Sequence, residues 1–178
     1  MAMDRDALAS LVASRLRDVQ DFPEPGVLFK DFTPLLADPH ALRAVVDDVV
    51  ARYEGRIDVI AGIEARGFMI GTACAVALAV PFVPIRKKGK LPAATFTASY
   101  DLEYGSATIE VHQDACGPGQ RVLIMDDVLA TGGTAAAACE LVDRTGAQVV
   151  AVDIVCEISS LGGRDRLRDR DVQALLQI

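Results

Sequence analysis

The sequence predicts an α/β domain built on an open, mostly parallel sheet flanked by helices. Three short apolar runs have the length of strands buried on both faces, at residues 57–62, 122–125 and 149–155. The first two runs are each followed by a short loop and a helix-forming segment, which is the order of strand–helix–strand units. Loops rich in charge or glycine follow these strand ends, where ligands bind in such sheets.

The N-terminal part is expected to hold two helices separated by a proline-rich loop. Apolar residues at helical spacing predict an amphipathic helix over residues 4–20, and they are Leu8, Leu11, Val12, Leu16 and Val19. Residues 21–39 are predicted to form a loop. Asp38 and Pro39 then provide an N-cap and a first helical residue for a helix that reaches Tyr53.

The remaining elements alternate between short strands and helices. They are expected as a helix at 68–79, a strand at 81–85, a hairpin of 95–100 with 106–111, a helix at 135–142, a helical turn at 162–170 and a closing strand or tail at 172–178. Thr134 is expected as the N-cap of the helix at 135–142.

Composition limits the classes of function. The chain of 178 residues is 51% hydrophobic and 24% charged, which is typical of one globular domain. Its net charge of −7 argues against a nucleic-acid partner. An anionic substrate remains compatible, because the few cations can gather in one cleft.

A membrane span and a metal-bound cysteine cluster are both disfavoured. Residues 67–85 carry no charge and are long enough to span a bilayer, but Pro81 and Pro84 divide them into a helix and a strand. The four cysteines are widely spaced and form no C-x-x-C pair. The acidic N-terminus leads into an amphipathic pattern, so we expect a cytoplasmic protein with reduced thiols.

Two carboxylates and a glycine-rich loop follow the apolar run 122–125. Asp126 and Asp127 precede a loop that closes on Thr131, Gly132, Gly133 and Thr134 before the next helix. The backbone N–H groups of such a loop and the helix N-terminus bind phosphate. The loop lacks the lysine of a Walker motif, and the carboxylates suit the vicinal hydroxyls of a ribose 5-phosphate or a divalent cation.

Two further segments carry cations at predicted strand ends. Arg66 lies between the strand at 57–62 and an apolar helix, which indicates a second anion site. Residues 86–90 contain four cations in five positions. Such a cluster is often only a solvated surface, and Lys88 is expected to be solvated.

The hairpin tip at residues 99–105 combines carboxylates with aromatic residues. A tip of this kind is typical of a lid that closes over a reacting ligand and excludes water. An ordinary hairpin turn at Gly105 is the alternative.

These segments resemble the phosphoribosyl-pyrophosphate signature of type I phosphoribosyltransferases, and most closely the adenine phosphoribosyltransferase family. The resemblance rests on residues 22–26, 57–68, 86–92, 98–105 and 122–134, which run in order over nearly the whole chain. It implies a single phosphoribosyltransferase domain over 1–178. A hood would come from about 1–37 plus the C-terminal end, and a hairpin lid from about 94–111.

The resemblance implies that the chain transfers 5-phosphoribosyl from phosphoribosyl pyrophosphate to adenine, giving AMP and pyrophosphate in purine salvage. Mg²⁺ would be the cofactor, bound through the substrate and in part through Asp126 and Asp127. Ribose-phosphate binding falls on Asp126, Asp127, Ala130, Thr131, Gly132, Gly133 and Thr134. Pyrophosphate binding falls on Arg66, Arg86, Lys87, Lys90 and Tyr104. The family is typically homodimeric.

The resemblance also assigns the base and the catalytic groups. Adenine binding falls on Val27, Leu28, Phe29, Lys30, Val128 and Ile158, and catalysis on Glu103 and Arg66. Many relatives carry Arg at the position of Lys30, which keeps the charge but not the planar fork. Enzymes for 6-oxopurines carry Asp at the position of Ala130, so its absence favours adenine.

Three alternatives remain open. Another type I transferase, for an oxopurine, orotate or uracil, would share the sugar-phosphate site. A ligand sensor of the same fold would need a DNA-binding module, and a pyrophosphate-donor synthetase would need nucleotide-binding segments. Neither addition is found in the sequence.

Overall fold

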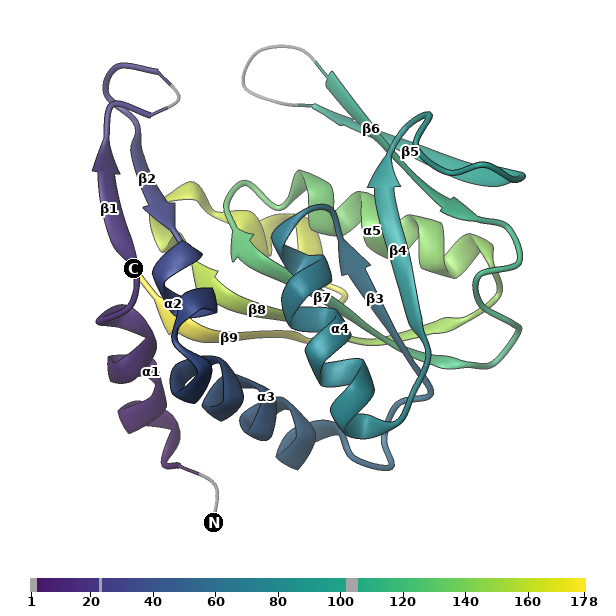
Figure 1. Cartoon of the computed structure of the whole chain (residues 1–178). Coiled ribbons are helices and arrows are strands. Elements are labelled where there is room, and N and C mark those ends of the chain that lie inside the picture. The colour runs from purple at the N-terminus through teal and green to yellow at the C-terminus, as the bar shows by residue number, and fades with distance from the viewer. Residues whose placement is uncertain (1–2, 23, 102–105) are drawn as a thin grey trace. The chain divides into compact units, whose positions relative to one another are not determined.

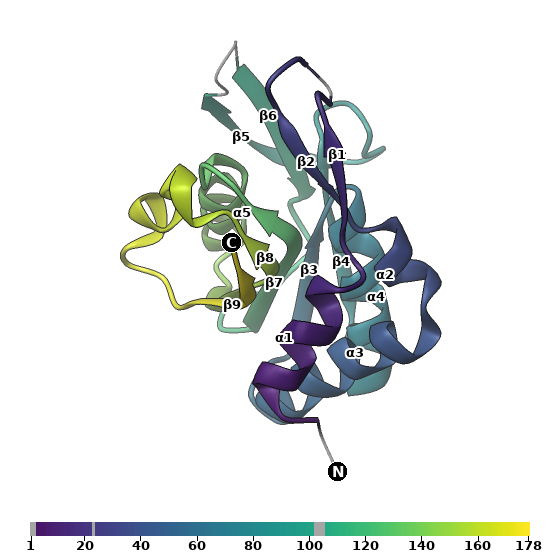
Figure 2. The same cartoon turned by 90° about the vertical axis from the view of Figure 1, so that its left-hand side faces the viewer.

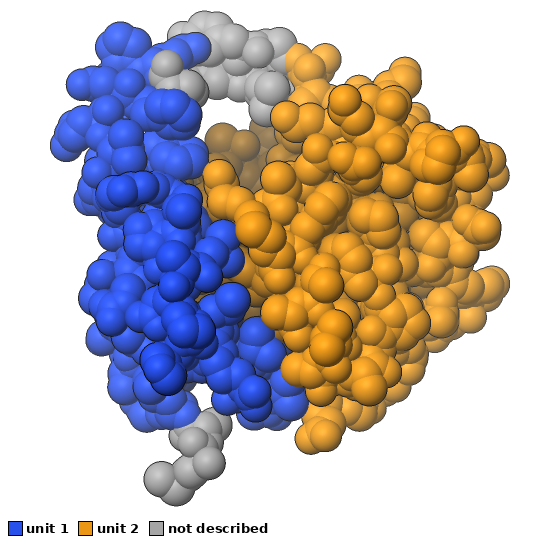
Figure 3. All heavy atoms as spheres, in the orientation of Figure 1, with its two compact units in different colours: residues 1–52 blue, residues 53–178 orange. Residues whose placement is uncertain are grey.

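The structure is a computed structural model that describes residues 3–22, 24–101 and 106–178. It contains two compact units, Met1–Arg52 and Tyr53–Ile178, which are coloured separately in Figure 3. The expected division into a hood, a central domain and a lid stays a prediction.

The first unit is helical with one small hairpin. Its elements are α1 (Arg5–Ala13), β1 (Arg17–Gln20), β2 (Leu28–Asp31), α2 (Thr33–Ala37) and nearly all of α3 (Pro39–Tyr53), all labelled in Figure 1.

The prediction of one helix over 4–20 is wrong beyond Ala13. Residues 17–20 form β1, which pairs antiparallel with β2. Two ion pairs join the strands, from Arg17 to Asp31 and from Lys30 to Asp18, the latter with 2.6 Å between Nζ and Oδ1. Opposite charges placed directly across two strands stabilise the pairing, and helical spacing alone does not reveal such partners.

The prediction of a loop over 21–39 is also partly wrong, because β2 and α2 lie within it. Phe32 and Leu35 are fully buried, whereas Val27 and Leu28 keep 42% and 45% of their surface exposed. The apolar residues of this segment therefore divide between the core and the surface.

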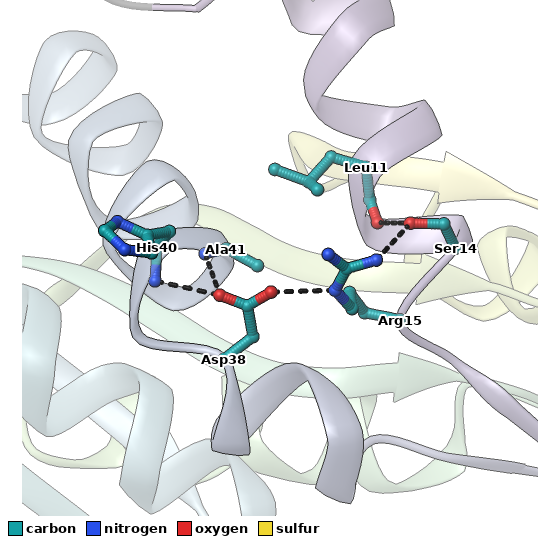
Figure 4. A network of polar contacts seen from close by, with 6 residues as sticks. All are labelled: Leu11, Ser14, Arg15, Asp38, His40 and Ala41. Carbon is teal, nitrogen blue, oxygen red and sulfur yellow. Dashed lines mark hydrogen bonds and ion pairs between the residues drawn. The ribbon is translucent and has the colours of Figure 1, made fainter.

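The predicted start of the helix at Asp38 and Pro39 is confirmed. One oxygen of Asp38 accepts hydrogen bonds from the N–H groups of His40 and Ala41, at 3.0 and 3.1 Å. The other accepts one from Arg15 Nε at 2.7 Å, which ties the end of α1 to the start of α3 (Figure 4). Arg15 and these N–H groups lower the pKa of Asp38.

The second unit is built on a mostly parallel sheet, as predicted. Its strands are β3 (Val59–Ile63), β4 (Phe82–Lys87), β5 (Thr95–Asp101), β6 (Ser106–His112), β7 (Arg121–Leu129), β8 (Gln148–Glu157) and β9 (Val172–Gln177). Among the described residues their order is β5-β6-β4-β3-β7-β8-β9. In this spatial order, the pairs β4-β3, β3-β7, β7-β8 and β8-β9 are parallel. Strand β6 pairs antiparallel with both β4 and β5.

Two long helices cover the sheet, α4 (Arg66–Leu78) and α5 (Gly133–Arg144). The connection β3-α4-β4 moves outward in one direction from the centre of the sheet, and β7-α5-β8 moves in the other. Because such crossovers are right-handed, the two helices lie on opposite faces, as Figure 2 shows. The strand order therefore reverses between β3 and β7, which is where ligands bind in open α/β sheets.

The structure corrects two local predictions in this unit. β7 continues to Leu129, so Asp126 and Asp127 lie within the strand rather than after it. The N-cap of α5 is Gly132, not Thr134, because α5 begins one residue before Thr134. The helical turn predicted at 162–170 is confirmed as the 3-10 segment η2 (Gly163–Leu167), and a second 3-10 segment, η1 (Ser159–Leu161), precedes it.

The central strands form the core of this unit. All five residues of β3 and residues 122–125 of β7 are buried. All four cysteines are buried thiols. In the part of the chain that the structure describes, no helix combines the length and apolar character needed to cross a membrane.

Candidate active site

The ends of β3 and β7 bring two predicted motifs into contact. Gly62 of β3 lies beside Met125 of β7 in parallel register, and α4 begins directly after β3. Arg66, the first residue of α4, donates a hydrogen bond from Nε to the carboxylate of Asp127. Asp127 is only 4% exposed. The contact therefore places a guanidinium and a buried carboxylate together at the reversal point of the sheet.

Gly67 makes this close approach possible. A Cβ at this position would lie 2.6 Å from the carbonyl oxygen of Met125 and 3.2 Å from Oδ1 of Asp126. Contacts this short to backbone atoms cannot be relieved by a side-chain rotation. Gly67 therefore lets the start of α4 pack directly against β7.

The carboxylates of Asp126 and Asp127 are adjacent and largely buried from solvent. The N–H of Asp127 donates to Oδ1 of Asp126 at 2.9 Å. Burial, followed by the adjacent charge of Asp127, raises the pKa of Asp126 well above its ordinary value. Hydroxyl donors or a cation would stabilise the charged form of this pair.

A small hollow of about 70 Å³ adjoins these carboxylates and is lined by Asp126 and residues 128–135. It is formed by the end of β7, the loop and the first turn of α5. Gly132, the N-cap, has a φ of 81°, a left-handed conformation that favours glycine. The first N–H groups of a helix have no partner within the helix and bind anions. The predicted ribose-phosphate residues other than Asp127 thus line one concave surface, together with Val128.

The turn at Gly163 supports this loop from the other side. A Cβ on Gly132 would lie 2.3 Å from the carbonyl oxygen of Gly163, and a Cβ on Gly163 would lie 2.3 Å from that of Ala130. Sequence reasoning did not identify Gly163 as a site residue. The pair Gly162-Gly163 was the available signal, but its partner lies about thirty residues away in the chain.

An ion pair fixes this turn to the sheet. Arg164 Nε donates to both oxygens of Glu157, at 2.9 and 2.8 Å, and its Nη1 donates to the carbonyl of Val172 at 2.8 Å. The side chain of Glu157 is 6% exposed. Leaving the buried carboxylate of Glu157 without its partner would be costly, so this ion pair holds the turn firmly beside residues 130–132.

The second cationic segment is organised by Glu64. Its Oε2 accepts hydrogen bonds from Arg86 Nε at 3.2 Å and from the N–H of Lys87 at 3.0 Å. Burial alone would raise the pKa of Glu64, but these donors and the two cations hold it below its ordinary value. Because Glu64 precedes Arg66 by two residues, the two predicted pyrophosphate segments are adjacent.

Sequence reasoning missed two carboxylates, Glu64 and Glu110. Both accept hydrogen bonds from the segment that contains the predicted cations. Glu64 stood beside Arg66 in the sequence and could have been considered. Glu110 lies between buried Ile109 and Val111, and the sequence pattern gave no signal for it.

The residues assigned to adenine lie in both units. Val27, Leu28, Phe29 and Lys30 belong to the first unit, where Lys30 is paired with Asp18. Ile158, in the second unit, is half-buried, and its N–H donates to the carbonyl of Leu129 at 2.9 Å. These assignments stay predictions.

The antiparallel hairpin of β5 and β6 is confirmed. Arg144 of α5 lies over the ring of Phe96, 4.8 Å from its centroid, and donates to the carbonyl of Thr97 at 2.7 Å. The predicted catalytic Glu103 and the predicted pyrophosphate ligand Tyr104 lie outside the described residues.

A larger hollow, of about 610 Å³, lies on an open apolar face of α4 between Phe68 and Val76. None of the predicted site residues lines it, so we assign it no part in the site.

Comparison with known proteins identifies the family. Residues 36–175 match the phosphoribosyl transferase domain family. The adenine phosphoribosyltransferase of Acidothermus cellulolyticus is 55% identical over 172 residues, which cover 96% of this chain and 97% of that protein. The chain belongs to the adenine phosphoribosyltransferases.

Solved structures agree with this assignment. The adenine phosphoribosyltransferase of Rhodothermus marinus has a TM-score of 0.91 at 47% identity, covering 97% of this chain and 99% of that one. The Saccharomyces cerevisiae enzyme has a TM-score of 0.92 at 40% identity, with 96% and 99% covered. That enzyme was solved with D-2,5-dideoxy-2,5-imino-altritol 1,6-bisphosphate and adenine.

Proposed function

We propose that the chain transfers the 5-phosphoribosyl group of phosphoribosyl pyrophosphate to adenine, releasing AMP and pyrophosphate in purine salvage. The observation that carries this function is the contact between Arg66 and Asp127 beside the hollow of residues 128–135. It joins a cation, a carboxylate pair and a helix N-terminus at the reversal point of the sheet. The assignment is supported by a relative of the chain at 55% identity, which is an adenine phosphoribosyltransferase.

The chemistry separates charge. As the bond between C1′ and the pyrophosphate oxygen breaks, positive charge grows on the ribose and negative charge on the leaving group. Arg66, Arg86 and Lys87, together with Lys90 and Tyr104, bind the pyrophosphate and stabilise its developing charge. Fixed cations of this kind contribute more in the transition state than in the ground state.

The carboxylates and the loop hold the other end of the donor. Asp126 and Asp127 accept hydrogen bonds from the ribose hydroxyls and lie near the ring that becomes cationic. The backbone of residues 130–134 and the start of α5 bind the 5′-phosphate. Binding at this remote group orients C1′ for attack.

We further propose that Mg²⁺ is bound with the donor. The pair Asp126 and Asp127 fits the ion, because it offers adjacent hard oxygen ligands. Burial, followed by the neighbouring charge of Asp127, raises the pKa of Asp126, and a cation would favour the charged form of that carboxyl. When bound, the ion neutralises charge on the pyrophosphate as it leaves.

The base is assigned by the resemblance. Val27, Leu28, Phe29, Lys30, Val128 and Ile158 are proposed to bind adenine. Attack through N9 requires control of the proton on the base, and Glu103 is the proposed acid and base. Ala130, where oxopurine enzymes carry Asp, favours the 6-aminopurine.

A homodimer in the cytoplasm is proposed from the same resemblance. The four buried cysteines are thiols, which supports a reducing compartment. Light scattering after size-exclusion chromatography tests the dimer, and a mass equal to the monomer's 18.9 kDa at micromolar concentration would contradict it.

The function is tested by measuring AMP and pyrophosphate released from adenine, phosphoribosyl pyrophosphate and Mg²⁺. Both products should appear in equal amounts. Replacing Asp126 and Asp127 together by Asn should abolish their formation and weaken donor binding. A double variant with normal rate and donor affinity would show that the carboxylates are only structural.

A further inference from the structure

Glu110 is a charged residue in an apolar position. It lies in β6 between Ile109 and Val111 and is 4% exposed, while its neighbours are 3% and 1% exposed. A buried carboxylate costs several kcal/mol unless its oxygens are satisfied. The chain nevertheless retains a glutamate in the strand, so its partners indicate what it does.

The partners of Glu110 are backbone donors. Its Oε1 accepts from the N–H groups of Lys90 and Leu91, each at 2.8 Å, and Thr95 Oγ1 lies 3.4 Å from Oε2. Burial would raise the pKa of Glu110, but the N–H groups of Leu91, Gly89 and Lys90 hold it below its ordinary value. The side chain is therefore a carboxylate that several N–H groups surround.

These donors belong to the connection between β4 and β5, which carries Lys90, one of the predicted pyrophosphate ligands. This connection and the end of β4 are fixed at three points. Glu110 holds the N–H of Lys90, Arg86 Nη1 donates to the carbonyl of Lys90 at 3.2 Å, and Glu64 holds the N–H of Lys87. Lys90 is thus the residue whose N–H and carbonyl are both fixed by charged side chains.

The side chain of Lys90 is exposed, in contrast to its anchored backbone. Within residues 3–22, 24–101 and 106–178 its ammonium makes no hydrogen bond or ion pair. Gly89, with a φ of 83°, supplies the left-handed turn just before it. The loop is therefore rigid where it meets the sheet and presents an uncompensated positive charge to solvent.

We propose that Glu110 is a positioning residue for the pyrophosphate group of the donor. By fixing the N–H groups of Lys90 and Leu91, it sets the point from which the Lys90 ammonium reaches that group. The inference rests on the proposed function, because it takes Lys90 as a pyrophosphate ligand. Glu110 itself touches neither substrate.

The test is Glu110→Gln, which keeps the shape of the side chain and removes its charge. Loss of a charge-assisted hydrogen bond should raise the KM for phosphoribosyl pyrophosphate, and the Kd for pyrophosphate, by about tenfold. The KM for adenine should change by less than about twofold, since its residues are elsewhere in the chain. Glu54→Gln, at an exposed glutamate, is the control of equal charge change and should leave all three values unaltered.

A double variant that combines Glu110→Gln with Lys90→Ala tests whether Glu110 acts on donor binding through Lys90. If Glu110 acts through Lys90, the two substitutions together should raise the donor KM little more than Lys90→Ala alone. Fully additive effects would overturn the proposal, as would an unchanged donor KM or an equal rise in the adenine KM. Glu110→Asp, which keeps the charge but shortens the side chain, should show the same selective loss if the amide variant fails to fold.

Binding of pyrophosphate is measured by calorimetry and needs no turnover. An unmodified enzyme that binds pyrophosphate but makes no AMP would refute the proposed function, while Glu110 could still be judged from the calorimetry. Normal turnover with identical pyrophosphate affinity in Glu110→Gln would refute the positioning role alone.

Discussion

Replacing Gly163 by Ala should damage donor binding without touching any predicted ligand. The new Cβ would lie 2.3 Å from the carbonyl oxygen of Ala130 and 3.0 Å from Cγ of Leu129. Ordinary contacts begin at 3.4 Å, so the loop and the turn must separate by about 1.1 Å. The loop proposed to bind the 5′-phosphate would then be displaced by a distance that matters for catalysis.

The size of the effect follows from that displacement. A misplacement of about 1 Å costs roughly a hundredfold in rate, and overpacking costs about 1–3 kcal/mol of stability. We therefore expect kcat/KM for phosphoribosyl pyrophosphate to fall about a hundredfold, since its 5′-phosphate uses this loop. Steady-state kinetics at saturating adenine and thermal unfolding measure the two effects.

Gly162→Ala is the matched control. It adds the same methyl group one residue earlier, where the nearest atom within 4 Å is Oδ2 of Asp165, at 3.5 Å. Gly162 has a φ of 64°, so this change also destabilises the fold, by about 1–2 kcal/mol. Its kcat/KM should stay within about threefold of the unmodified enzyme, because the loop is not displaced. Unaltered kinetics in Gly163→Ala, or equal losses in both variants, would refute the reasoning.

Three more outcomes are expected. Glu103→Gln should lower kcat far more than donor affinity, and unchanged single-turnover rates would remove Glu103 from the mechanism. Arg66→Lys should lower kcat/KM for the donor by about 10²–10³, because lysine cannot contact both Asp127 and the pyrophosphate; near-normal turnover would argue against Arg66 as a ligand. Asp58, whose pKa Arg121 lowers from 3.8 to about 2, stabilises the fold above pH 3.8, and this contribution disappears as the pH falls towards 2. Asp58→Asn should therefore be less stable at pH 6 yet lose less stability between pH 4 and pH 2, and parallel unfolding midpoints for both proteins would contradict this.

The sequence predicted the sheet correctly, and it placed the proposed phosphate site beside it, because both depend on local patterns. Apolar runs of strand length mark β3, β7 and β8, and the acidic pair with its glycines marks the loop after β7. The fold class then follows from the alternation of strands and helices. The contact between Arg66 and Asp127 was not predicted, although both residues were expected near the ends of parallel strands.

The elements predicted wrongly and the residues missed are those whose contacts are with residues distant in the chain. Residues 17–20 have helical spacing with α1, but Asp31 and Lys30 stabilise them as a strand. Gly163 packs against the carbonyl of Ala130, and Glu110 accepts a hydrogen bond from the N–H of Lys90. No local sequence pattern predicts either contact. Positioning residues are therefore found from the structure, whereas ligands near strand ends can be found from the sequence.

The most direct test of the account is a comparison of bases. Turnover with phosphoribosyl pyrophosphate and Mg²⁺ is measured for adenine, hypoxanthine, guanine, uracil and orotate under identical conditions. The account predicts AMP from adenine and no nucleotide from the other four bases. Turnover of an oxopurine would contradict the argument from Ala130, and donor binding without turnover of any base would contradict the assignment as a transferase.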